Sequence, residues 1–221
     1  MRSVSGQGRA VDDAAEPLLE LRAVMARLRA ECPWKAEQTH RSLVRYLLEE
    51  THETIEAVDR LAAGEPGAVE HLREELGDLL LQVYFNAAVA AEAGGFDIDD
   101  VARSITDKMV RRNPHVFGDE ADQGGAAGQV PDAAAVNERW QQIKAAEKAH
   151  RTTVDEGVPA GLPALLYADK VLDRLHRAGH DVGLDPASTD LGERLLILVE
   201  EARAEGLDPE QALRDAVRRR T

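Results

Sequence analysis

Aromatic residues, cysteine and long apolar runs are scarce in this sequence. Three Phe, three Tyr and two Trp are all the aromatic side chains among 221 residues, and Cys32 is the single cysteine. A lone cysteine cannot form an internal disulfide, and no base stands beside Cys32, so a structural role is expected for it. No apolar stretch is long enough for a membrane span, and the N-terminal segment has no apolar secretion signal. These absences predict a cytoplasmic protein without a membrane partner.

Strand patterns and basic stripes are also missing. No segment alternates apolar and polar residues convincingly, whereas Ala, Glu, Leu and Arg are abundant. This composition predicts an all-α fold. The formal net charge is -14, and no basic stripe offsets it, which argues against a nucleic-acid duplex as a partner. A nucleotide remains compatible with this charge, because bound divalent cations reverse the local field.

Apolar residues at helical spacing, together with capping and stop signals, divide the chain into segments. Helices are predicted at about residues 17–31, 42–63, 68–93, 98–112, 133–150, 162–175, 191–204 and 209–219. Residues 1–15 are small and polar, which predicts a disordered N-terminus. Residues 119–132 are rich in Gly, Ala and Asp, which predicts a mobile loop.

The most informative stretch is residues 47–86, where two helical patterns flank a Gly/Pro turn. Each pattern carries a carboxylate pair one helical turn apart, Glu50 with Glu53 and Glu75 with Asp78. The second helix is apolar on both sides of its polar stripe, so the stripe is predicted to be interior, where a carboxylate must be paired or bind metal. Antiparallel packing would bring four carboxylates together, and such an oxygen site suits Mg²⁺.

Other charged residues allow a plainer interpretation. Glu49 points away from the predicted core, and for it a solvated position is the better interpretation. On the helix at 98–112, Lys108 and Arg112 continue the direction of the apolar face, while Arg111 is rotated by about a quarter turn. These cations either extend to solvent and complement the helix dipole, or bind phosphate opposite the acidic cluster.

Trp140 and Lys144 share one face of the helix predicted at 133–150. Trp140 is either a core residue or a stacking surface for a base. After residue 157 the apolar pattern restarts, and Glu200 and Glu201 are not followed by a second acidic pair. The C-terminal helices are therefore predicted to serve packing or dimerisation.

The arrangement Glu49-Glu50-x-x-Glu53 followed by Glu75-x-x-Asp78 resembles the EExxE…ExxD motif of MazG-type nucleoside triphosphate pyrophosphohydrolases. The resemblance covers about residues 20–175 and includes further blocks at 32–43, 46–53, 71–85, 96–101, 107–119 and 140–148. The segment 157–171 is similar to the linker into the family's second helical unit. Two departures are Lys35, where the family usually has Asp, and Asn113, where it often has His.

The resemblance implies an all-α, four-helix-type bundle that forms a homodimer, here with a C-terminal helical extension. It implies a catalytic domain at 16–150 and a degenerate second unit at 151–221. It also implies hydrolysis of a nucleoside triphosphate to the monophosphate and pyrophosphate, with Mg²⁺ as cofactor and Mn²⁺ as a substitute. The residues matching its metal ligands are Glu50, Glu53, Glu75 and Asp78. Those matching or flanking its nucleotide-binding positions are Lys108, Arg111, Arg112, Trp140 and Lys144, while Trp34, Gln38 and His40 match a block near the base pocket.

Two functional hypotheses follow. In the first, the protein is a nucleotide-pool house-cleaning hydrolase in which Glu53 or Glu49 accepts the proton of the attacking water. In the second, it is a non-enzymatic helical dimer that senses a nucleotide or binds a protein. The complete set of four acids favours the first hypothesis, and the reduced second unit favours the second.

Overall fold

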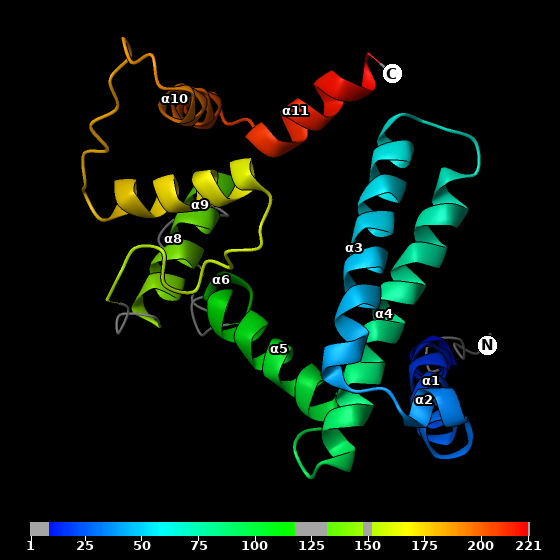
Figure 1. The fold of residues 1–221 in the computed structure, drawn as a ribbon. Coiled ribbons are helices and arrows are strands. Elements are labelled where there is room, and N and C mark those ends of the chain that lie inside the picture. Colours follow the sequence, from blue (N-terminus) through cyan, green and yellow to red (C-terminus); the bar gives the residue numbers. More distant parts are fainter. Residues whose placement is uncertain (1–8, 118–131, 148–151, 221) are drawn as a thin grey trace, which may run out of the picture. The chain divides into compact units, whose positions relative to one another are not determined.

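The protein is helical throughout the residues that the computed structural model describes, which are 9–117, 132–147 and 152–220. No strand occurs within these residues, so the predicted all-α class is confirmed. Contacts divide the chain into two compact units, residues 1–132 and 133–221. Figure 1 shows the helices of both. The predicted catalytic domain ends at residue 150, and because grouping by contacts does not test where catalysis ends, that boundary stays a prediction.

Six helices are described in the N-terminal unit. They are α1 (Arg9–Glu31), α2 (Pro33–Ala36), α3 (His40–Ala62), α4 (Ala68–Glu92), α5 (Ile98–Arg112) and α6 (Pro114–Phe117). The C-terminal unit contains α8 (Ala133–Ala146), α9 (Ala164–Arg177), α10 (Leu191–Ala204) and α11 (Pro209–Arg218).

The hairpin of α3 and α4 is the frame of the N-terminal unit (Figure 1). Helix α3 begins with a capping box, in which Thr39 accepts a hydrogen bond from the Ser42 amide and Ser42 accepts one from the Thr39 amide. Before α4, Gly67 has a φ of 76°, which a residue with a Cβ rarely adopts. Ala57 is fully buried and Leu43 nearly so. The small side chain of Ala57 lets the two helices approach closely.

The core of this unit lies where α1 packs on α4. Met25, Leu43, Tyr84 and Phe85 form its buried cluster. The Tyr84 hydroxyl donates a hydrogen bond of 3.2 Å to the Leu18 carbonyl, which satisfies its polar end. Tyr84 and Phe85 belong to the same buried cluster, so two of the few aromatic residues lie in the core of the unit.

Arg29 joins three segments at one edge of that core. Its guanidinium is buried and donates to the Glu92 carboxylate, with a distance of 2.7 Å from Nε to Oε1. It also donates to the carbonyl of Lys35 and, at 3.1 Å, to that of Gln38. The hydrogen bond that Arg29 donates to Glu92 raises the pKa of Arg29 and lowers the pKa of Glu92. Arg29 thereby fixes the segment around α2 against α1 and the end of α4.

Helix α5 begins at the predicted cap. The Asp97 carboxylate accepts from the Asp100 amide at 3.0 Å, and the Asp100 carboxylate accepts from the Asp97 amide at 3.1 Å. These bonds satisfy two amide donors that a helix start leaves open. The helix ends at Asn113 because Pro114 cannot continue it.

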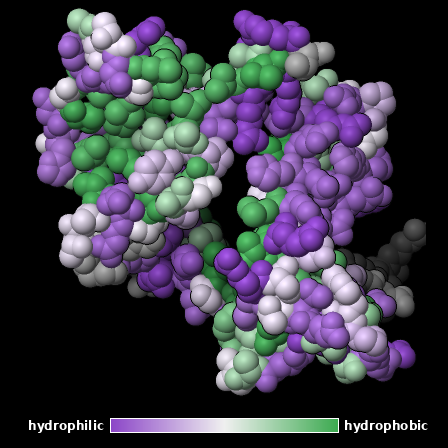
Figure 2. Space-filling model, in the orientation of Figure 1, coloured by the Kyte–Doolittle hydropathy of each residue, from purple (hydrophilic) through white to green (hydrophobic). Residues whose placement is uncertain are grey.

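In the C-terminal unit, α9 packs against α10 and α11. Arg203 connects α10 to α9 through Asp169, at 2.6 Å, and through Asp173, at 3.3 Å. Figure 2 shows apolar side chains gathered on the surface of this unit. The exposed leucines of α10 are Leu191, Leu195 and Leu198.

Several boundaries differ from those predicted. Helix α1 begins at Arg9 rather than at Pro17, so residues 9–15 belong to a helix. The segment before Pro17 is rich in Ala, Asp and Glu, and good helix formers there outweigh the single hydrogen bond that Pro17 removes. The short helices α2 and α6 were not predicted. Residues 1–8 and nearly all of the predicted mobile loop at 119–132 lie outside the described residues. No described helix has both the length and the apolar character needed to cross a membrane.

Candidate functional site

Three carboxylates meet between α3 and α4. Glu50 on α3 and Glu75 and Asp78 on α4 each offer an oxygen, and these oxygens lie within 4.8 Å of one another. The helical spacing explains the arrangement, because Glu75 and Asp78 are one turn apart on the face that α4 turns to α3. We call these three residues the acidic cluster. The sequence pattern predicted this convergence.

The electrostatics of the acidic cluster centre on Glu50. Burial raises the pKa of Glu50, and the charges of Asp78, Glu53 and Glu75 and a hydrogen bond shared with Glu53 raise it further. The Nδ1 atom of His71 lies 3.3 Å from Oε1 of Glu75, on the next turn of α4. Among the described residues, this imidazole is the one cation-capable group within ion-pair distance of the cluster. The described residues therefore leave the like charges of the cluster largely uncompensated.

This donor set fits a hard divalent cation. Carboxylate oxygens are the ligands that Mg²⁺ takes from proteins, and Mg²⁺ keeps further positions for water and phosphate. Glu50 and Glu75 are half-buried, but Asp78 is exposed, so the prediction of an interior polar stripe is wrong at Asp78. Acids that repel one another raise the free energy of the folded state unless a cation joins them. Glu53, one turn along α3 from Glu50, is exposed and is not among the three residues whose oxygens meet. Its predicted ligand role stays a prediction.

Glu49 takes a different direction. It is exposed, and Oε1 lies 3.6 Å from the Arg45 guanidinium, one turn earlier on α3. The structure therefore places Glu49 in a surface ion pair and does not bring it to the acidic cluster.

The predicted phosphate-binding cations lie toward the end of α5. Arg112 is buried, Lys108 is half-buried and Arg111 is exposed. Lys108 lines a shallow cavity of about 490 Å³ together with Phe96 and Ile105. Neither Lys108 nor Arg112 is found in contact with the acidic cluster in the described part of the chain. Their grouping on one helix was predicted, and their role stays a prediction.

The block around α2 forms a second polar and aromatic group. Trp34 is 48 % exposed, and its ring meets that of Tyr46 edge-on at 5.9 Å. The Lys35 ammonium lies over Trp34 and, at 5.1 Å, over Phe85. Both distances are typical of cation–π interactions. The indole of Trp34 remains exposed to solvent.

Gln38 and His40 continue this group toward α4. The Gln38 amide donates to the Trp34 carbonyl at 2.9 Å. Nδ1 of His40 lies 2.8 Å from Oδ1 of Asn86, two turns along α4 from Asp78. The block that the resemblance assigned to base binding therefore reaches the same helix as the acidic cluster.

Trp140 and Lys144 lie on α8 in the C-terminal unit. The Lys144 ammonium sits 4.9 Å from the centre of the Trp140 ring, and both residues are half-buried. The predicted shared face is therefore observed. Their predicted contact with a nucleotide remains a prediction.

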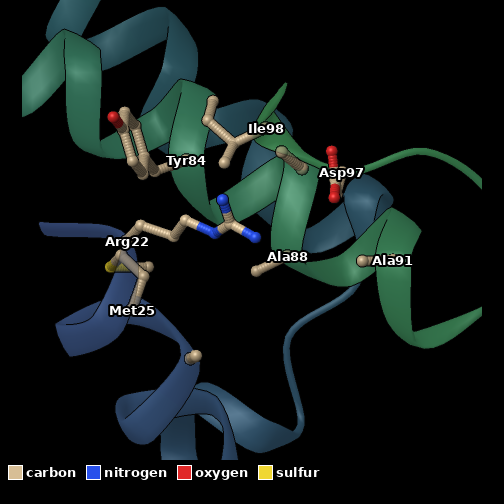
Figure 3. Close-up of a pocket in the computed structure, with 9 residues that line it drawn as sticks. Arg22, Met25, Tyr84, Ala88, Ala91, Asp97 and Ile98 are labelled. Carbon is tan, nitrogen blue, oxygen red and sulfur yellow. The ribbon is translucent and has the colours of Figure 1, made fainter. Parts of the chain in front are cut away.

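A cavity of about 230 Å³ lies between α1, α4 and the start of α5. Figure 3 shows Arg22 reaching across it, with Met25 and Tyr84 on its walls. Arg22 pairs with Asp99 at 2.5 Å. The lining contains none of the predicted site residues and little polar surface, so this cavity is not where the acidic chemistry gathers.

Two features escaped the sequence analysis. One is the Arg29–Glu92 pair, which joins residues far apart in the chain and has no local signal. The other is Gln82, a buried residue on the α4 stripe between Asp78 and Asn86, whose Oε1 has no hydrogen-bond partner among the described residues. The helical wheel does place Gln82 on the polar stripe, so its position was predictable although its missing partner was not.

The structure is thus that of an all-α protein with a cluster of three carboxylates, able to hold a metal ion, between two antiparallel helices. Residues 38–117 match the model of the MazG nucleotide pyrophosphohydrolase domain. An uncharacterised 26.1 kDa protein of Streptomyces cacaoi is 45% identical over 201 residues, covering 90% of this chain and 77% of that protein. A nucleoside triphosphate pyrophosphohydrolase of Escherichia coli is 38% identical over 195 residues, covering 85% of this chain and 68% of that enzyme.

A nucleoside triphosphate pyrophosphohydrolase of Mycobacterium tuberculosis is 43% identical over 173 residues. That alignment covers 77% of this chain but 48% of the mycobacterial enzyme, so the chain spans about half of that relative. The three residues of the acidic cluster, Glu50, Glu75 and Asp78, lie within the matched residues 38–117. The chain belongs to the MazG family.

Proposed function

We propose that the protein hydrolyses nucleoside triphosphates to the monophosphate and pyrophosphate in a Mg²⁺-dependent reaction. The acidic cluster carries this proposal, because Glu50, Glu75 and Asp78 place three carboxylate oxygens within 4.8 Å in a chain of the MazG family. The names of the relatives from Escherichia coli and Mycobacterium tuberculosis support the reaction type.

In the proposed mechanism, Glu50, Glu75 and Asp78 hold the cation. When bound, Mg²⁺ supplies positive charge to the triphosphate and lowers the pKa of water, and Mn²⁺ is the expected substitute. Glu53 shares a hydrogen bond with Glu50, so it lies close enough to the cluster to add a ligand oxygen or to accept the proton of the attacking water. Glu49, paired with Arg45, is the weaker candidate for the base.

The rest of the substrate needs cations and an aromatic surface. Lys108 and Arg112 are the proposed phosphate ligands, with Arg111 beside them, because charge-assisted bonds stabilise the negative charge of a pyrophosphate leaving group. Trp140 and Lys144 are proposed to bind the nucleotide, and Trp34 and Gln38 to lie near the base. With this reaction we propose a house-cleaning role in the nucleotide pool.

We also propose that the protein acts as a homodimer. Helices α3 and α4 leave large apolar side chains uncovered, including Leu47, Leu76 and Val83, which are 40 %, 50 % and 40 % exposed. Covering them with a second copy removes apolar area from water. Sedimentation as a monomer at micromolar concentration would contradict this part of the proposal.

Product analysis tests the reaction. The purified protein is incubated with each common NTP and dNTP, with Mg²⁺ or with EDTA, and the products are separated by anion exchange. Monophosphate plus pyrophosphate, lost in EDTA, is the expected result. Diphosphate plus phosphate would keep the metal site but overturn the reaction.

Two neighbouring residues of α4 provide a matched pair of variants. Glu75→Gln removes a cluster oxygen and is expected to lower kcat/KM by about 100-fold or more. Glu74→Gln alters an exposed acid with the same charge change and is expected to leave kcat/KM within about twofold, as surface changes usually do. Equal activity of both variants would show that Glu75 does not serve the reaction. No turnover of any nucleotide by the wild type would favour the alternative function, a non-enzymatic dimer that senses nucleotides or binds a protein.

A further inference from the structure

Gln82 is the buried polar residue of α4 that the proposed mechanism leaves without a task. Gln82 is 5 % exposed, and within the described part of the chain its Oε1 is buried and has no hydrogen-bond partner. Its backbone carbonyl is satisfied by the Asn86 amide at 2.9 Å. A buried amide oxygen without a partner raises the free energy of the folded state, so a role for this residue must offset that cost.

The register of the hairpin shows where Gln82 lies. At one end, the Thr54 hydroxyl donates to the Glu75 carbonyl. At the other end, His40 meets Asn86. In an antiparallel pair these contacts run in a steady order, so Gln82 falls between the acidic cluster and the His40–Asn86 pair.

The spacing along α4 is set by the helix. Residues four apart rise by about 6 Å along the axis and share a face. Gln82 is therefore one step of about 6 Å from Asp78, and Asn86 is one step further. On α3, Leu43 and Tyr46 occupy the matching level, and Tyr46 contacts the exposed Trp34 ring.

In a nucleotide, the covalent structure places the sugar between the triphosphate and the base. With the triphosphate at the acidic cluster and the base near Trp34, the sugar lies between them. Gln82 occupies that intermediate level. We propose that the Gln82 amide hydrogen-bonds a sugar hydroxyl of the nucleotide and makes the enzyme select for it. This inference rests on the proposed function, and it names the part of the substrate that this one residue recognises.

A hydroxyl is the group that suits this amide best. It both donates and accepts, so it can pair with Oε1 or with the amide nitrogen, whichever way the side-chain amide is turned. A site built to hydrogen-bond a hydroxyl discriminates strongly against a substrate that lacks it, because a buried polar group is then left unpaired. The competing role is purely structural, with a buried water that bridges the amide to its surroundings.

The experiment compares hydroxyl selectivity in the wild-type protein and in Gln82→Met. Methionine keeps the length and the unbranched shape of glutamine but cannot pair with a hydroxyl. For each protein, kcat/KM is measured with one NTP and with its 2′-deoxy, 3′-deoxy and 2′,3′-dideoxy forms. We expect the wild type to lose about tenfold when the recognised hydroxyl is missing, as the loss of one such bond implies. We expect Gln82→Met to treat the forms within about twofold of one another.

Thermal unfolding supplies the second measurement. Replacing an unpaired buried amide by an apolar group of similar size is neutral or stabilising, so Gln82→Met is expected to unfold at the wild-type temperature or above it. Gln142→Met, on the exposed side of α8, is the matched control and should keep the wild-type selectivity. If circular dichroism shows that Gln82→Met does not fold, Gln82→Leu replaces it.

The outcomes separate the inference from the proposed function. Wild-type selectivity that persists in Gln82→Met overturns the inference, as does an equal loss of kcat/KM for all four substrates. A wild type that ignores both hydroxyls also overturns it while leaving the proposed reaction intact. A wild type that releases no pyrophosphate from any nucleotide overturns the proposed function and the inference with it.

Discussion

Glu50 is the residue of the acidic cluster whose pKa is shifted by burial and by its acidic neighbours. Its pKa is raised above the ordinary value of 4.5, first by burial and then by Asp78, Glu53 and Glu75. A carboxyl whose folded-state pKa is raised stabilises the fold fully while protonated, below its unfolded pKa. That stabilisation is lost as the pH rises through the folded pKa. The metal-free protein is therefore expected to lose this contribution as the pH rises above about 4.5.

Glu50→Gln removes the titrating group and tests this sign. In EDTA, the variant and the wild type should unfold at similar temperatures near pH 4, and the variant should gain relative to the wild type toward pH 7. Adding Mg²⁺ at neutral pH should raise the unfolding temperature of the wild type and close that gap. Thermal melts followed by circular dichroism across this range provide the measurement. A gap that widens toward acid would show that another group controls the titration.

For single residues, the sequence predicted which side chains share a helix face better than it predicted which atoms they contact. Glu50, Glu75 and Asp78 were predicted to converge because helical spacing alone places them on facing stripes. Glu53 was predicted to join them; it is exposed and shares a hydrogen bond with Glu50, and its role as a fourth ligand stays a prediction. Whether Oε1 of Gln82 finds a hydrogen-bond partner depends on the side chains that α3 packs against it. The sequence of α4 alone does not contain that information.

Among the elements, the segment around α2 depends on one side chain from α1. Arg29 holds the carbonyls of Lys35 and Gln38 and the carboxylate of Glu92. Arg29→Met keeps the apolar stem but loses these bonds. We expect it to destabilise the protein by about 2 kcal/mol, since charged hydrogen bonds are lost and carbonyls are left open. We also expect a rise of about tenfold in KM, because Trp34 and Gln38 lose their fixed position.

Arg27→Met on the same helix is the control for this variant. Arg27 makes an exposed pair with Glu31, and such pairs contribute at most about 1 kcal/mol. Urea unfolding and steady-state kinetics should separate the two variants. The Mg²⁺ concentration for half-maximal activity should be unchanged in Arg29→Met, because the acidic cluster lies on α3 and α4. A shifted Mg²⁺ dependence would mean that Arg29 supports the cluster itself.

Most helices were predictable because their signals are local. Asp97, the Gly64–Gly67 turn and Asn113-Pro114 set boundaries that the structure keeps within a residue or two. The start of α1 was misplaced because Pro17 is as compatible with a first turn as with an interior kink, and neighbouring residues decide between them. Helix α6 is a single turn, too short for apolar periodicity to register. How helices pair, as in the Arg29 contact, depends on residues far apart in the chain.

The whole molecule combines two units with unequal chemistry. The N-terminal unit holds the acidic cluster, whereas in the C-terminal unit two acids of α9, Asp169 and Asp173, pair with Arg203. Within the residues that the structure describes, no acid, His or Cys group of the C-terminal unit gathers as the cluster does. Metal binding should therefore stabilise one unit selectively, because a ligand stabilises only the part whose folded state binds it.

Hydrogen exchange on the full chain measures this selectivity. Adding Mg²⁺ is expected to slow amide exchange in α3 and α4, around Glu50 and Asp78, because joining the helices through a cation suppresses their local opening. Exchange in α10 and α11 should stay the same. In Asp78→Asn the effect on α3 and α4 should largely disappear, while the exchange of α10 and α11 reports that the second unit remains folded. Protection that spreads equally over both units would mean that they open together, and that the C-terminal helices take part in the metal-linked state rather than standing apart from it.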